Sequence, residues 1–173
     1  MNGFSDDSFR PDDPILRQQL AKMLVLAQLR LADENYSKVQ GHSTQTPTYS
    51  YPLGYLKTAS AAVYLPWNEA LGAGALSTIT RLELAMAVAP IGDGILEPPR
   101  STYRLPFLDV PASAAKDVAL LDFNGVLSAT GPTTFSPDAL AATRGQTARA
   151  IGLMLRPQQK VNLPPGVTTT TAP

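Results

Sequence analysis

Three short segments of this 173-residue chain open in the same way, and they constrain its fold more than any other feature. Each starts a stretch of apolar residues at helical spacing with an arginine, and a glutamine or glutamate follows two residues later. The arginines are Arg17, Arg81 and Arg144, separated by 64 and 63 residues. Nearly equal spacing is typical of a repeat whose units bury a shared core. The sequence therefore predicts three helices with equivalent starts.

The second and third of these helix starts carry a capping pattern. Thr80 is followed by Glu83, and Thr143 is followed by Gln146. In a capping box the hydroxyl accepts a hydrogen bond from the backbone N–H three residues later, and the acid or amide reaches back to the N–H of the cap. Both threonines are therefore expected to cap their helices, and loss of either would cost about 1 kcal/mol.

The first helix start departs from this pattern. Leu16 stands where the hydroxyl belongs, so we expect that cap to be absent. Asp13 is then expected to cap an earlier start, with Pro14 in the first turn, where its missing N–H needs no partner. The helices predicted from apolar spacing and breakers cover residues 14–31, 59–71 with an interruption at Pro66, 80–89 up to Pro90, 111–123 up to Asn124–Gly125, and 143–156.

Composition excludes several classes of protein. Lys and Arg number 14, as do Asp and Glu, so the chain has no large basic field for nucleic acid. There is no cysteine and a single histidine, which removes thiolate and multi-histidine metal sites. The sequence has no catalytic or phosphate-binding motif and no apolar run long enough to span a bilayer. We therefore expect neither an enzyme nor a cofactor or metal site, and no membrane-spanning segment.

Motifs outside the helices strengthen the repeat. The motif Phe107-Leu108-Asp109-Val110-Pro111 is followed by Asn124-Gly125-Val126, then by Phe135-Ser136-Pro137, and then by Thr143-Arg144-Gly145-Gln146. This order of motifs resembles the S-layer homology (SLH) family. Residues 2–29 are similar to the second half of such a unit, and residues 55–89 match loosely. The resemblance implies three divergent units, of which the first lacks its first helix. The ranges are 1–32 for this half unit, 33–54 for a loop, 55–90 for a divergent unit, 91–106 for a linker, 107–156 for a nearly complete unit, and 157–173 for an extended tail rich in proline and threonine.

The resemblance to SLH proteins implies an all-α fold of short helix-loop-helix repeats around a pseudo-threefold axis. It also implies an extracellular, non-catalytic module whose grooves bind an acidic cell-wall polysaccharide. The residues expected to contact the glycan are Arg17, Arg81, Arg144, Glu83, Gln146 and Trp67. Each has a second interpretation that the sequence leaves open. The arginines could be exposed or ion-paired at helix starts, Glu83 and Gln146 could serve as caps, and Trp67 could be a core anchor.

An alternative function is a structural subunit that assembles into a surface layer, tube or filament. The half unit at residues 1–32, the long loop 33–54 and the extended tail are the features that favour it. An incomplete unit can be completed by another copy, as in domain swapping, which predicts a homo-oligomer or polymer.

Overall fold

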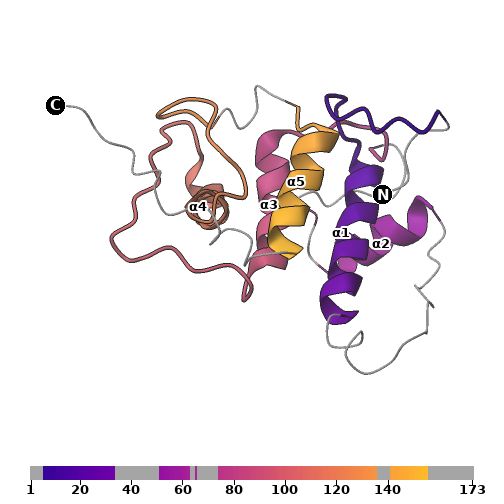
Figure 1. The fold of residues 1–173 in the computed structure, drawn as a ribbon, viewed down its shortest axis with the longest axis horizontal. Helices are drawn as coiled ribbons and strands as arrows, with labels where there is room; N and C mark the ends of the chain where they lie inside the picture. Colours follow the sequence, from indigo (N-terminus) through magenta and orange to yellow (C-terminus); the bar gives the residue numbers. More distant parts are fainter. Residues whose placement is uncertain (1–5, 34–50, 63–64, 66–73, 136–140, 156–173) are drawn as a thin grey trace.

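The computed structural model describes residues 6–33, 51–62, 65, 74–135 and 141–155, and within these ranges the protein is helical (Figure 1). The α-helices are α1 (Arg17–Asp33), α2 (Leu53–Ala61), α3 (Arg81–Gly92), α4 (Ala115–Phe123) and α5 (Arg144–Leu155), and a short 3-10 turn, η1 (Ala112–Ala114), leads into α4. In the described ranges, β-pairing occurs only as isolated bridges between residues. The predicted all-α class is confirmed.

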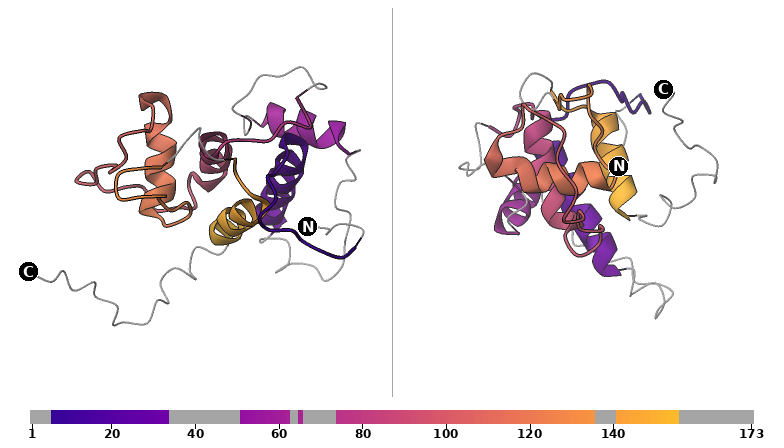
Figure 2. Two further views of the ribbon diagram at one scale, coloured as in Figure 1. Left: turned by 90° about the horizontal axis from the view of Figure 1, so that it is seen from above. Right: turned by 90° about the vertical axis from the view of Figure 1, so that its left-hand side faces the viewer.

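The three helices that begin with arginine lie together at the centre of the molecule. α1, α3 and α5 contact one another, while α2 packs against α1 and α4 packs against α3. Figure 2 shows α2 and α4 toward opposite ends of the molecule. The residue three positions after each arginine is Leu20, Leu84 or Thr147, and each of these is fully buried. The Thr147 hydroxyl donates to the Thr143 carbonyl at 2.9 Å, which permits a polar residue at this core position.

Backbone hydrogen bonds connect the three helix starts in a closed ring. Ile15 N–H donates to the Ala142 carbonyl at 2.9 Å, Ala142 N–H donates to the Ile79 carbonyl at 2.8 Å, and Ile79 N–H donates to the Ile15 carbonyl at 3.3 Å. Each of the three residues stands two positions before its arginine and is almost completely buried. The ring satisfies these buried backbone groups and holds the three helix starts in a cyclic arrangement.

The predicted start of the first helix was wrong. α1 begins at Arg17, because the preceding residues are extended and pair with both other helix starts. Pro14 bridges to Thr143 and Leu16 bridges to Thr78. Asp13 therefore does not cap the helix, although its carbonyl accepts from Arg144 N–H at 2.9 Å.

Half of a capping box remains at the start of α1. The Gln19 side-chain oxygen accepts from Leu16 N–H at 3.1 Å, as the acid or amide of a complete box does. The leucine has no hydroxyl to return the bond, so this helix start depends more on the ring of backbone hydrogen bonds.

The second and third helices also differ from the prediction. α2 begins at Leu53 and ends at Ala61, whereas the sequence predicted a helix over residues 59–71. The helix lies earlier because Tyr55, Leu56 and Ala59 are buried where α2 packs against α1. α3 continues through Pro90 to Gly92. A proline in the last turn removes one N–H without ending the helix, so the predicted linker starts later than residue 91.

The last two helices agree with the prediction within a few residues. Gly125 has φ of +64° directly after α4, which is the left-handed conformation expected at a helix end. The side-chain oxygen of Asn124 accepts from Glu97 N–H at 3.1 Å, so the turn is also tied to the segment after α3. The predicted interruption at Pro66, most of the loop 33–54 and the tail 157–173 lie outside the described residues.

Candidate binding site at the helix starts

Arg81 lies inside the molecule and joins the start of α3 to the segment that precedes α5. Its Nε donates to the Phe135 carbonyl at 3.1 Å, and its Nη2 donates to the Ser128 carbonyl at 2.6 Å. The guanidinium carbon is 5.0 Å from the centre of the Phe135 ring, and the residue is 5% exposed. Burial lowers the pKa of the Arg81 guanidinium from its ordinary value. These contacts make Arg81 a link between two segments far apart in the sequence.

Arg144 repeats this arrangement at the start of α5. Its Nε donates to the Phe9 carbonyl at 2.9 Å, and its guanidinium carbon is 5.1 Å from the centre of the Phe9 ring. Arg144 is also 5% exposed. Both phenylalanines stand in a Phe-x-Pro motif, Phe9-Arg10-Pro11 and Phe135-Ser136-Pro137. Each motif thus supplies a carbonyl and a ring to the arginine of another helix start, a pairing that the motif itself could have suggested.

The first arginine forms an ion pair with an acid at the start of α3. Arg17 Nη2 is 3.0 Å from Glu83 Oε1, and the two side chains are 15% and 25% exposed. The other oxygen of Glu83 accepts from Thr80 N–H at 2.8 Å, while the Thr80 hydroxyl accepts from Glu83 N–H at 3.2 Å. The predicted capping box is confirmed, and Glu83 serves both as a cap and as the partner of Arg17.

The third helix start has the second predicted capping box. Gln146 Oε1 accepts from Thr143 N–H at 3.3 Å, and the Thr143 hydroxyl accepts from Gln146 N–H at 3.2 Å. Close packing against Pro11 explains why a glycine, Gly145, stands between these two residues. Its N–H donates to the Pro11 carbonyl at 2.8 Å, and a Cβ at this position would lie 3.0 Å from that carbonyl oxygen.

The structure brings five of the six predicted contact residues to the helix starts, but their accessibility differs. Arg81 and Arg144 direct their guanidinium groups toward the interior, whereas Arg17 and Glu83 are partly exposed. Gln146 is half-buried and engaged in its cap. Trp67 lies outside the described residues. Whether these residues bind a glycan stays a prediction.

The acid of the Phe-x-Asp-Val-Pro motif positions the Phe-x-Pro motif. The Asp109 carboxylate accepts from Phe135 N–H at 2.9 and 3.2 Å through its two oxygens. The rings of Phe107 and Phe135 pack together with centroids 5.6 Å apart. Phe107, Asp109 and Phe135 therefore fix the carbonyl and ring that receive Arg81, which makes this acid a positioning group.

The acidic N-terminal turn is bound to its own neighbours. The Asp6 carboxylate accepts from the Ser8 hydroxyl at 2.6 Å and from Arg10 Nη2 at 2.8 Å. The hydrogen bonds from Ser8 and then from Arg10 lower the pKa of Asp6 to about 2.

The described residues contain no group of three side chains suited to a metal ion. None of the helices in the described ranges has the length and hydropathy needed to cross a bilayer.

A comparison with known protein families finds a similarity over a short part of the chain. The family model for the S-layer homology domain matches residues 1–21. These residues include Phe9, Ile15 and Arg17, so the matched stretch contributes to the backbone ring and to the pairing of arginine with phenylalanine. SLH domains are in general non-catalytic modules that anchor proteins to the cell wall. No curated protein matches the chain.

Proposed function

We propose that the chain is a non-catalytic cell-surface module of SLH type that anchors to an acidic cell-wall polysaccharide. The observation that carries this proposal is the closed hydrogen-bond ring of Ile15, Ile79 and Ala142, after which three helices led by arginine begin. The ring gives each helix start the same relation to the next, as expected for three copies of one unit. The match of the SLH model to residues 1–21 supports the same interpretation.

The partly exposed pair at the ring is the proposed point of contact with the glycan. Arg17 and Glu83 are partly exposed, and a guanidinium can donate a charge-assisted hydrogen bond to a sugar carboxylate. Arg81 and Arg144 contribute differently in this proposal, because both are buried and each donates to a protein carbonyl. Their role is to hold the units in register so that a groove exists, while Gln146 and Trp67 remain proposed contacts.

Co-sedimentation with purified cell-wall fragments tests this function. The folded chain is expected to pellet with native fragments and to stay in solution when the acidic groups of the glycan are amidated. Arg17→Gln should weaken pelleting several-fold. Arg149→Gln is the matched control, since it removes the charge of an exposed arginine on α5. If the folded chain fails to pellet with native fragments, or pellets equally with amidated ones, the proposal is wrong.

The alternative function, a subunit of a self-assembling surface layer, is favoured by a difference between the three central helices. Four and eight positions after the arginine, α1 has Ala21 and Val25 facing α2, and both are buried. The equivalent residues of α3, Ala85 and Ala89, are buried too. In α5 the equivalent residues are Ala148 and Gly152, of which the first is half-buried and the second exposed.

This difference matches the neighbours of each helix. Among the described elements, α5 contacts α1 and α3 and has no third helix corresponding to α2 or α4. A helix from a second copy of this chain is the proposed partner of this face. Light scattering would then show oligomers that Gly152→Arg dissociates and that Gln28→Arg, an exposed change on α1, leaves intact. A monomer at all concentrations in the unmodified protein would exclude assembly through this face.

A further inference from the structure

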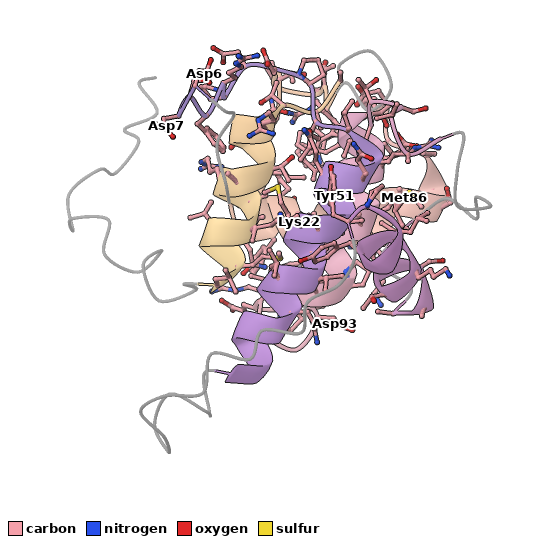
Figure 3. All side chains as sticks on the ribbon, turned by 90° about the vertical axis from the view of Figure 1, so that its right-hand side faces the viewer. Asp6, Asp7, Lys22, Tyr51, Met86 and Asp93 are labelled. Carbon is pink, nitrogen blue, oxygen red and sulfur yellow. The ribbon has the colours of Figure 1, made fainter. Side chains whose placement is uncertain are left out.

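Lys22 on α1 and Tyr51 form a cationic and aromatic pair, in which Tyr51 is exposed and Lys22 is half-buried (Figure 3). Lys22 Nζ is 5.5 Å from the centre of the Tyr51 ring and 5.8 Å from that of Tyr55. The two rings meet edge to face, with centroids 6.3 Å apart and an interplanar angle of 61°. Tyr55 is buried, whereas Tyr51 is 50% exposed. The buried ring thus anchors a neighbouring ring that remains open to solvent.

The surroundings of this pair carry positive charge, although the whole chain has none in excess. Up to Gln28, α1 carries Arg17 and Lys22 and no acid, and α2 carries Lys57 and no acid. Arg17 is paired with Glu83, so Lys22 and Lys57 supply the excess positive charge. The positive charge of Arg144 also acts on Tyr51. Burial raises the pKa of Tyr51, and the charge of Arg144 partly opposes this rise. Asp6 and Asp7 lie well away from the pair in Figure 3. An anionic ligand would therefore be attracted to this surface.

An exposed tyrosine beside an ammonium group has the chemistry to recognise an acidic sugar. The ring offers a flat apolar face to the C–H groups of a pyranose, while its hydroxyl remains available for a hydrogen bond. The ammonium, which already lies over the aromatic rings, can form a charge-assisted hydrogen bond with a carboxylate. Tyr51 packs against Tyr55, and Lys22 Nζ lies over both rings, so binding would have to order these two side chains less than free ones.

We propose that Tyr51 and Lys22 form a subsite for an acidic monosaccharide unit, with the sugar against the Tyr51 ring and its carboxylate at Lys22 Nζ. This inference rests on the proposed wall-binding function and names a contact for it that is separate from the arginine-led helix starts. The tyrosine supplies affinity for the sugar ring, and the lysine supplies the preference for an acid. The two contributions can be removed one at a time.

Saturation-transfer difference NMR on the full chain tests the subsite, with methyl β-glucuronide as the acidic probe and methyl β-glucoside as the neutral one. The unmodified protein should transfer saturation to the glucuronide at least fivefold more strongly than to the glucoside. Tyr51→Ala should reduce the transfer to both sugars at least fivefold, and Tyr51→Phe should keep most of it. Lys22→Gln should remove the preference for the glucuronide.

Leu53→Ala is the matched control, because Leu53 is 48% exposed and stands two residues from Tyr51. It should leave both signals unchanged, and circular dichroism verifies that every variant retains its helices. The inference is overturned if the unmodified protein shows no transfer, if it treats the two sugars alike, or if Tyr51→Ala behaves as the Leu53 control does. Unmodified protein that pellets with wall fragments while showing any of these results would retain the proposed function and lose only the subsite.

Discussion

Replacing Arg81 by alanine tests whether this arginine holds the units together. The change removes two hydrogen bonds from a charged donor, at 3.1 Å to the Phe135 carbonyl and at 2.6 Å to the Ser128 carbonyl, and it also removes the contact with the Phe135 ring. Each charged hydrogen bond contributes about 1.5–3 kcal/mol. The guanidinium no longer has to be desolvated in the variant, which offsets part of this loss. We expect the free energy of unfolding to fall by about 2–4 kcal/mol, within the range of the larger single-mutant effects.

Urea unfolding followed by far-ultraviolet circular dichroism measures this loss. Arg149→Ala is the control, because Arg149 is exposed and donates one hydrogen bond, to the Val126 carbonyl at 3.2 Å. Its cost should stay below about 1 kcal/mol. A double-mutant cycle with Phe135→Ala should give a coupling of at least about 1 kcal/mol, since the two side chains are in contact. If the free energy of unfolding of Arg81→Ala lies within about 0.5 kcal/mol of that of the unmodified protein, the structural role of Arg81 is refuted.

Three further changes test local features of the structure. Thr80→Ala should lower the free energy of unfolding by about 1 kcal/mol in urea, because it removes the hydroxyl of a complete capping box. The pKa of Asp6 in the folded protein lies below its unfolded value, so the contribution of Asp6 to stability is present above pH 4 and is lost as the pH falls toward 2. NMR titration of Asp6 should find a midpoint of about 2, and Ser8→Ala should raise this midpoint. Burial, and then the hydrogen bond and charge of Asp122, raise the pKa of Tyr103, so its contribution is present below about pH 10 and is lost above it. NMR of the Tyr103 ring should show ionisation at lower pH in Asp122→Asn, and an unchanged midpoint would contradict the contact.

Features set by neighbouring residues could be predicted from the sequence. Thr80 with Glu83, and Thr143 with Gln146, form the expected capping boxes, because every partner lies within one turn of the helix. Gly125 ends α4 for the same kind of reason, since its positive φ is a property of that residue and its turn.

Predictions of features that depend on distant residues were wrong or incomplete. Pro14 suits the first turn of a helix, yet it is extended because Thr143 pairs with it across the ring. The start of α2 depends on the side of α1 that it covers, and the pattern between residues 51 and 62 does not contain that information. The Tyr51–Lys22 pair shows the same limit, because Tyr51 falls within the predicted loop 33–54 and lies beside Lys22 only where α2 packs on α1.

The sequence by itself determined that three helices begin with an arginine, since spacing and capping are local. Only the tertiary structure decided where those arginines point. Arg81 and Arg144 turn inward because carbonyls from Phe135 and Phe9 accept their donors and the two rings lie beside them. Arg17 instead meets Glu83 near the surface. A buried guanidinium is stable only where acceptors replace water, and those acceptors come from segments brought together by the ring.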